Sequence, residues 1–148
     1  MSTGTRLRET GRVALALVCA VLAVTATASA TEGTESDTAA DRPIVLMIHA
    51  DWCGTCRVLG PVWEQIQTDF ADNSTVVVFD VTDRNAYAES AQAAKALGVE
   101  DFFSKHRAKT GTIAVLACNS HEPVAVLKGE RDIAVYRAAL AKAACETP

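Results

Sequence analysis

Apolar and polar residues alternate along the chain in blocks that predict strands and helices in turn. Residues 44–48 form a continuous apolar run, which is typical of a strand that is buried on both faces. After Cys53 the apolar residues recur at helical spacing and form one stripe: Leu59, Val62, Trp63, Ile66 and Phe70. Pro61 lies within this stripe and should kink the helix. We therefore predict a buried strand followed by an amphipathic helix.

The next block repeats this order. Residues 75–81 are apolar and β-branched, which predicts a second buried strand. Thr82 and Asp83 can cap a helix over residues 84–97, and Gly98 can end it. Residues 99–111 break the pattern, and we interpret them as an insertion.

The last block predicts a hairpin and a helix. Residues 112–117 and 124–127 are apolar runs on either side of a turn over residues 119–123. Gly129 ends the second run, and Asp132 can cap a helix whose stripe is Ile133, Tyr136, Leu140 and Ala143. The order βαβαββα predicts an α/β fold with a central mixed four-stranded sheet flanked by helices.

The first thirty residues have the pattern of a secretory signal peptide. Three arginines precede an uncharged stretch that ends in Ala28-Ser29-Ala30, and its strongly apolar part covers about 12 residues. We expect cleavage there and export to the periplasm or another extracytoplasmic compartment, with an N-terminal membrane anchor as the alternative. Residues 31–42 are polar and acidic, which predicts a flexible linker. The folded domain is then expected over residues 43–148.

The charge of the chain argues against nucleic acid as a partner. The formal net charge is −4, and removal of residues 1–30 takes away three arginines and one glutamate, which leaves −6. A surface that binds phosphates needs a basic patch. The basic residues cluster at Lys105, His106, Arg107 and Lys109, which we interpret as a solvated loop, with a partner surface as the alternative. The neighbouring Phe102 and Phe103 are expected in the core.

Two of the five cysteines, Cys53 and Cys56, are separated by two residues at the junction of a predicted strand and helix. The first thiol would lie at the helix N-terminus, where free N–H groups and the helix dipole stabilise a thiolate. The second would lie one turn later, close enough to resolve a mixed disulfide. This spacing predicts thiol–disulfide exchange, with Cys53 as the nucleophile and Cys56 as the resolving thiol.

The stretch Ala50-Asp51-Trp52-Cys53-Gly54-Thr55-Cys56-Arg57 resembles the W-C-G-P-C-K signature of the thioredoxin family. Pro61 falls where that family carries its helix-kinking proline, and the resemblance extends over residues 43–144. It implies a thioredoxin-like fold and protein disulfides as substrates. We interpret Trp52 as a surface aromatic that helps partners dock, with plain packing as the alternative. The A-D-W-C form is also similar to the periplasmic thioredoxin-like domain of membrane reductant conductors, which favours reduction.

Three positions depart from the family pattern. Thr55 replaces the proline between the cysteines, so the resemblance does not fix the redox potential. Met47 replaces a buried acid that the family uses for proton transfer, so water or another base is needed. Gly111, just before Thr112, replaces the cis-proline that faces the cysteines. A cis bond before glycine would cost about 2.5–4 kcal/mol, so we expect a trans peptide.

His49 and the two remaining cysteines of the domain raise further possibilities. His49 could bind copper(I) or zinc together with Cys53 and Cys56, act as a base, or pack where the family has an aromatic ring. We expect packing and no resident metal. Cys118 and Cys145 should both lie at the end of the sheet away from Cys53. A disulfide between them is feasible, and two free thiols are the alternative.

We therefore predict an exported thiol–disulfide oxidoreductase that acts through Cys53 and Cys56 as a reductase, without a cofactor and as a monomer. An exported dithiol needs an upstream electron donor, so a membrane-bound reductant partner is expected. Two alternatives remain open. One is a copper- or zinc-binding module that uses His49. The other is a non-catalytic interaction domain with the same fold.

Overall fold

The computed structural model describes residues 41–145. The predicted signal peptide and nearly all of the predicted linker lie outside the described residues. The last residue of that linker, Arg42, donates hydrogen bonds to the carbonyl oxygens of Ala71, at 3.2 Å, and of Asp72. The chain is therefore held against the domain immediately before its first strand.

Eight elements make up the described part of the chain. In order they are β1 (Ile44–His49), α1 (Gly54–Phe70), β2 (Thr75–Asp80), α2 (Arg84–Ala96), α3 (Glu100–His106), β3 (Thr112–Leu116), β4 (Pro123–Lys128) and α4 (Ile133–Ala143). The strands form one sheet in the order β2-β1-β3-β4, in which β1 and β2 are parallel and the other neighbours are antiparallel. The predicted α/β fold with a mixed four-stranded sheet is confirmed.

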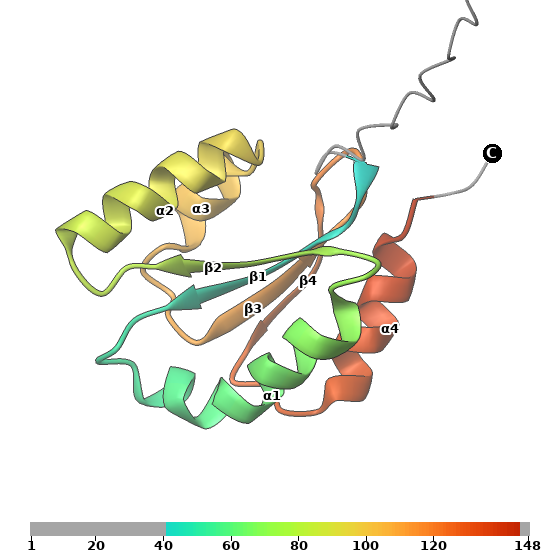
Figure 1. Ribbon diagram of the computed structural model, residues 1–148, viewed down its shortest axis with the longest axis horizontal. Helices are drawn as coiled ribbons and strands as arrows, with labels where there is room; N and C mark the ends of the chain where they lie inside the picture. The colour runs from blue at the N-terminus through green and yellow to red at the C-terminus, as the bar shows by residue number, and fades with distance from the viewer. Residues whose placement is uncertain (1–40, 146–148) are drawn as a thin grey trace, which may run out of the picture. The chain divides into compact units, whose positions relative to one another are not determined.

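Helices cover both faces of the sheet: α1 and α4 pack on one face, and α2 and α3 on the other (Figure 1). The central strand β1 shows why this requires a continuous apolar run. Val45 and Met47 point into the cluster under α1 and α4, whereas Leu46 and Ile48 point into the cluster under α2 and α3. Because both faces of β1 are covered, every position along it except the last is buried.

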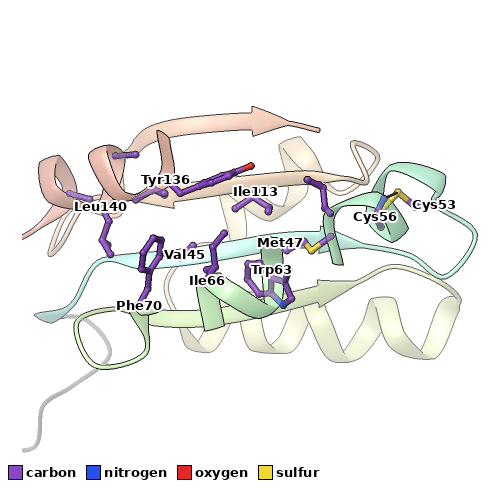
Figure 2. Packing of buried hydrophobic residues seen from close by; sticks show 14 of the residues in the cluster. Val45, Met47, Cys53, Cys56, Trp63, Ile66, Phe70, Ile113, Tyr136 and Leu140 are labelled. Atoms are coloured by element: carbon purple, nitrogen blue, oxygen red, sulfur yellow. Dashed lines mark hydrogen bonds between the residues drawn. A yellow bond between two sulfur atoms is a disulfide. The ribbon is translucent and has the colours of Figure 1, made fainter. Parts of the chain in front are cut away.

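The predicted apolar stripe of α1 is its buried face. Leu59, Trp63, Ile66 and Phe70 are buried in one cluster with residues of β1, β3 and α4, and Figure 2 shows Cys53 and Cys56 at one end of this cluster. The helix continues through Pro61, whose side chain is exposed. The packing of α1 on the sheet thus fixes where the two cysteines lie.

The segment that we interpret as an insertion, residues 99–111, contains helix α3, which the sequence pattern did not predict. Strand β3 is antiparallel to β1, and Thr112 pairs with Ile48 while Leu116 pairs with Ile44. The chain must therefore return along the sheet after α2, and α3 provides that crossing. The prediction that its two phenylalanines lie in the core is confirmed: both are buried, and the Phe103 ring lies 5.1 Å from that of Phe79, edge to face.

Among residues 41–145, no helix combines the length and the apolar character that a membrane span requires.

Candidate active site

The two cysteines lie where β1 passes into α1, and they are joined by a disulfide with a Cα–Cα distance of 5.2 Å. Cys53 is the N-cap residue of α1, with extended backbone angles of φ −80° and ψ 107°. Its Sγ accepts a hydrogen bond from the backbone N–H of Cys56 at 3.1 Å, as a capping oxygen would do. The first turn of α1 contains no acidic residue. Negative charge on the Cys53 sulfur is therefore favoured by both a donor and the helix dipole.

Both cysteines are largely covered, with exposed fractions of 5% for Cys53 and 3% for Cys56. The Cys56 sulfur lies 3.9 Å from the carbonyl oxygen of Ile48, on the inner side of the helix. Met47 is buried in the same cluster as both cysteines, so an apolar side chain occupies the position where the resemblance implies an acid. The surroundings of Cys56 thus contain a carbonyl oxygen but no carboxylate at that position.

The loop before β3 closes over the Cys53 sulfur. Gly111 has φ +76°, and a Cβ added there would lie 2.7 Å from the γ-methyl carbon of Thr55 and 3.6 Å from the Cys53 sulfur. Its N–H donates to the carbonyl oxygen of Ile48 at 2.9 Å, and its carbonyl accepts from the N–H of Gly129 at 3.0 Å. The following residue, Thr112, is buried within β3. Only glycine combines this backbone conformation with so close an approach to Thr55.

Trp52 lies beside the disulfide and is the most exposed large apolar side chain of the described domain, at 62%. Its indole N–H donates to the carbonyl oxygen of Thr82 at 3.2 Å, and the Thr82 hydroxyl accepts from the N–H of Asp51 at 3.0 Å. Two hydrogen bonds thus tie the turn before Cys53 to the end of β2. Gly54 begins α1, and a Cβ there would meet only the Arg57 guanidinium, at 3.9 Å, so the space around Gly54 does not require glycine.

Comparison with known proteins agrees with this arrangement. The family model named Thioredoxin matches residues 24–101, which is more than half of the chain. The chain belongs to the thioredoxin family. A thioredoxin from Haemophilus influenzae is 37% identical over 46 residues, which cover 31% of this chain and 43% of that protein. A thioredoxin H-type from Chlamydomonas reinhardtii is 38% identical over 53 residues, or 36% and 44% of the two chains. The matches thus span less than half the length of these relatives.

Solved thioredoxin structures align with a larger part of the chain. The X-ray structure of Fasciola hepatica thioredoxin covers 70% of this chain and 82% of its own, with 19% identity and a TM-score of 0.46. The thioredoxin of Malassezia sympodialis covers 70% and 78%, with 26% identity and a TM-score of 0.42.

His49 lies close to the carboxylates of Asp51 and Asp80. Its Nε2 lies 3.4 Å from Oδ1 of Asp51, and it is paired with Asp80 in the register of β1 and β2. The donor atoms of these three residues lie within 4.8 Å of one another, and within residues 41–145 this is the group of possible metal ligands that comes together. The two cysteines are not part of it. In this structure Cys53 and Cys56 are bonded to each other.

A second disulfide joins Cys118 and Cys145 at the opposite end of the sheet, with a Cα–Cα distance of 5.1 Å. Cys118 follows β3 and Cys145 follows α4, and the N–H of Cys118 also donates to the carbonyl oxygen of Ala143 at 2.8 Å. Of the two arrangements considered from the sequence, the structure has the disulfide.

Sequence reasoning missed a cleft beside Trp52. The cleft has a volume of about 370 Å³ and is lined by Trp52, Val81, Tyr87, Arg107 and Ala108. These residues come from three separate segments, so no local pattern brings them together. The available signals were an exposed tryptophan before the first cysteine and a basic cluster that the chain later brings to it.

Proposed function

We propose that this domain is an exported thiol–disulfide oxidoreductase that reduces protein disulfides as a monomer. The observation that carries the proposal is the position of Cys53, whose sulfur caps α1 while Cys56 lies one turn further along the helix. Membership of the thioredoxin family supports the same chemistry. The relatives are named thioredoxins.

The proposed reaction transfers two electrons to the substrate. The Cys53 thiolate attacks one sulfur of a substrate disulfide, and the other substrate sulfur leaves as a thiolate that takes up a proton. Cys56 then loses its proton to solvent and attacks the Cys53 sulfur of the mixed disulfide. The second substrate thiolate leaves and is protonated, and the domain is left with the Cys53–Cys56 disulfide. A donor must reduce that bond before the next cycle.

Two observations support export. The first thirty residues have the pattern of a signal peptide. The disulfide between Cys118 and Cys145 is of the kind that persists in oxidising compartments. An exported reductase is isolated from cytoplasmic reductants, so we propose a membrane-bound donor that returns electrons to Cys53 and Cys56. Cell fractionation and N-terminal sequencing of the mature protein test export directly. Recovery of the uncleaved chain in the cytoplasm would contradict it.

Insulin reduction tests the activity. The residue 31–148 protein should reduce insulin disulfides catalytically in the presence of dithiothreitol, and Cys53→Ser should abolish this because it removes the attacking thiolate. The double variant Cys118→Ser with Cys145→Ser is the matched control, since it also removes one disulfide but leaves the Cys53 thiol in place. Full activity of Cys53→Ser, or no turnover by a wild-type protein with an intact Cys53–Cys56 pair, would refute the proposal. The second result would favour the non-catalytic interaction domain.

A further inference from the structure

The cleft beside Trp52 is lined by apolar and aromatic side chains and one arginine, with no acidic residue among them. Three of its five lining residues are aromatic or β-branched, and Arg107 is the one lining residue that carries a full charge at neutral pH. Trp52 immediately precedes Cys53, so the cleft adjoins the sulfur that the proposed function uses.

The Arg107 guanidinium is available to a ligand. It lies 5.4 Å from the centre of the Tyr87 ring in a cation–π contact, and its side chain donates no hydrogen bond to another group of residues 41–145. The ion pairs of residues 41–145 are His49–Asp51 and Arg137–Asp69, and neither involves Arg107. An exposed guanidinium with no carboxylate partner, beside an active site, is suited to bind one from outside.

Two acidic side chains that lie close to this wall along the chain, Asp83 and Asp51, already have partners. The Asp83 carboxylate caps α2 by accepting from the N–H groups of Asn85 and Ala86, at 2.7 and 3.0 Å. Asp51 is paired with His49. On the other side, the exposed Lys109 follows Arg107 on the segment that leads to Gly111. The charge along this segment is therefore positive, although the domain as a whole is acidic.

We propose that the cleft formed by Trp52, Tyr87 and Arg107 selects disulfides that have a carboxylate side chain close in sequence to the attacked cysteine. The inference rests on the proposed function and adds a substrate class to it. Arg107 binds the carboxylate in a forked, charge-assisted contact, while Trp52 and Tyr87 pack against the apolar parts of the same segment. Basic flanking segments are repelled by Arg107 and Lys109.

Matched peptides test the selection. Two disulfide-linked peptides should differ only in Glu or Gln beside the cysteine, and kcat/KM is measured for each. The wild-type domain should prefer the Glu peptide by roughly three- to tenfold, as for one charge-assisted contact at a partly exposed site. Arg107→Gln should bring this ratio close to one, because the Glu peptide loses its charge-assisted contact. Arg131→Gln is the matched control, because Arg131 is also exposed but does not line the cleft.

A binding measurement separates this inference from the proposed function. Peptides with Ser in place of Cys cannot react. Their affinity for the oxidised domain is followed by tryptophan fluorescence, to which the exposed Trp52 and the buried Trp63 both contribute. The Glu peptide should bind more tightly to the wild type and to Arg131→Gln, but not to Arg107→Gln, and the preference should decline as salt is added. Equal affinity for both peptides, or a preference that survives Arg107→Gln, overturns the inference. Absence of turnover with the preference intact would contradict the reductase and not the cleft.

Discussion

The two disulfides of this domain are the same covalent bond in two different settings. Cys53 and Cys56 are three residues apart at the start of α1, beside an exposed tryptophan and a cleft. Cys118 and Cys145 are 27 residues apart and join the end of β3 to the end of α4. The first bond closes a very short loop and constrains the unfolded chain little. The second closes a long loop and fixes the C-terminus. Position, rather than bond type, separates the proposed redox site from a structural crosslink.

The most direct test of this difference is to let the two disulfides compete for the same reductant and to find which is reduced first. The helix N-terminus stabilises the Cys53 thiolate and so favours the reduced form of the first pair, whereas the folded domain holds the second pair together. Redox-active pairs lie at about −270 to −120 mV and structural disulfides below about −300 mV. The Cys53–Cys56 pair should therefore be reduced first, by at least about 30 mV.

Equilibration in graded dithiothreitol buffers, followed by alkylation and mass spectrometry of each cysteine peptide, measures this order. The Cys118→Ser, Cys145→Ser double variant should give the same midpoint for Cys53 and Cys56 as the wild type. Simultaneous reduction of both pairs would show that the distinction between the two settings is wrong.

Removing the Cys118–Cys145 disulfide should lower the stability of the domain but keep its activity. The Cys118→Ser, Cys145→Ser variant should lose about 3.5 kcal/mol of unfolding free energy, because the 27-residue loop is no longer closed in the unfolded chain. Its activity should remain at a temperature where it is folded. Urea unfolding under oxidising conditions measures the loss. A variant as stable as the wild type would mean that this bond does not constrain the chain.

Gly111 packs against Thr55 at the Cys53–Cys56 end of the sheet, so a variant there tests that end only. Gly111→Ala should cost about 2–3 kcal/mol, because alanine is strained at φ +76° and its Cβ would overlap the Thr55 methyl. Thr55→Ser removes that methyl and should recover about 1 kcal/mol in the Gly111→Ala background. It leaves the backbone strain and the Thr55 Cβ, which would lie 2.8 Å from the alanine Cβ. Chemical unfolding of the four proteins in this double-mutant cycle measures the coupling.

Gly60→Ala is the matched control for this cycle. Gly60 lies inside α1, where an added Cβ meets no atom within 4 Å apart from its chain neighbours and the helix backbone. Alanine restricts the unfolded chain there, but Pro61 follows and disfavours a helical residue with a Cβ, so Gly60→Ala should change the stability by less than about 1 kcal/mol. If both alanine variants were equally stable, the close approach over Cys53 would have no energetic consequence.

Local sequence patterns predicted some elements and contacts of this domain and missed others. Strand β1 and the stripe of α1 were predictable because continuous or periodic burial is recorded in neighbouring residues, and the junction between them placed Cys53 and Cys56. Helix α3 was missed because its seven residues are too few to establish a periodic stripe. The approach of Gly111 and Gly129 to Thr55, and the meeting of Trp52 with Arg107, depend on how separate segments pack. No local pattern contains that information.

Tyr136, in the core cluster that also contains Cys53 and Cys56, gives the smallest destabilising effect that we predict. Its hydroxyl donates to the carbonyl oxygen of Glu130 at 2.9 Å, so Tyr136→Phe should cost about 1 kcal/mol at pH 7. Burial raises the pKa of Tyr136 above its ordinary value, and the Glu130 carboxylate raises it further. The folded domain thus keeps a proton that the unfolded chain loses near pH 10, so stability should fall above pH 10, by up to about 1.4 kcal/mol per pH unit.

Urea unfolding between pH 8 and pH 11.5 tests this dependence. Tyr136→Phe should flatten the alkaline decline, because phenylalanine has no proton to lose in either state. Tyr87→Phe is the control and should keep the decline, since it retains Tyr136. An identical alkaline slope in Tyr136→Phe and the wild type would assign the decline to other groups. Neither variant should change which disulfide is reduced first. The Tyr136 hydroxyl donates to the Glu130 carbonyl and not to a cysteine sulfur, and its ring lies in the core.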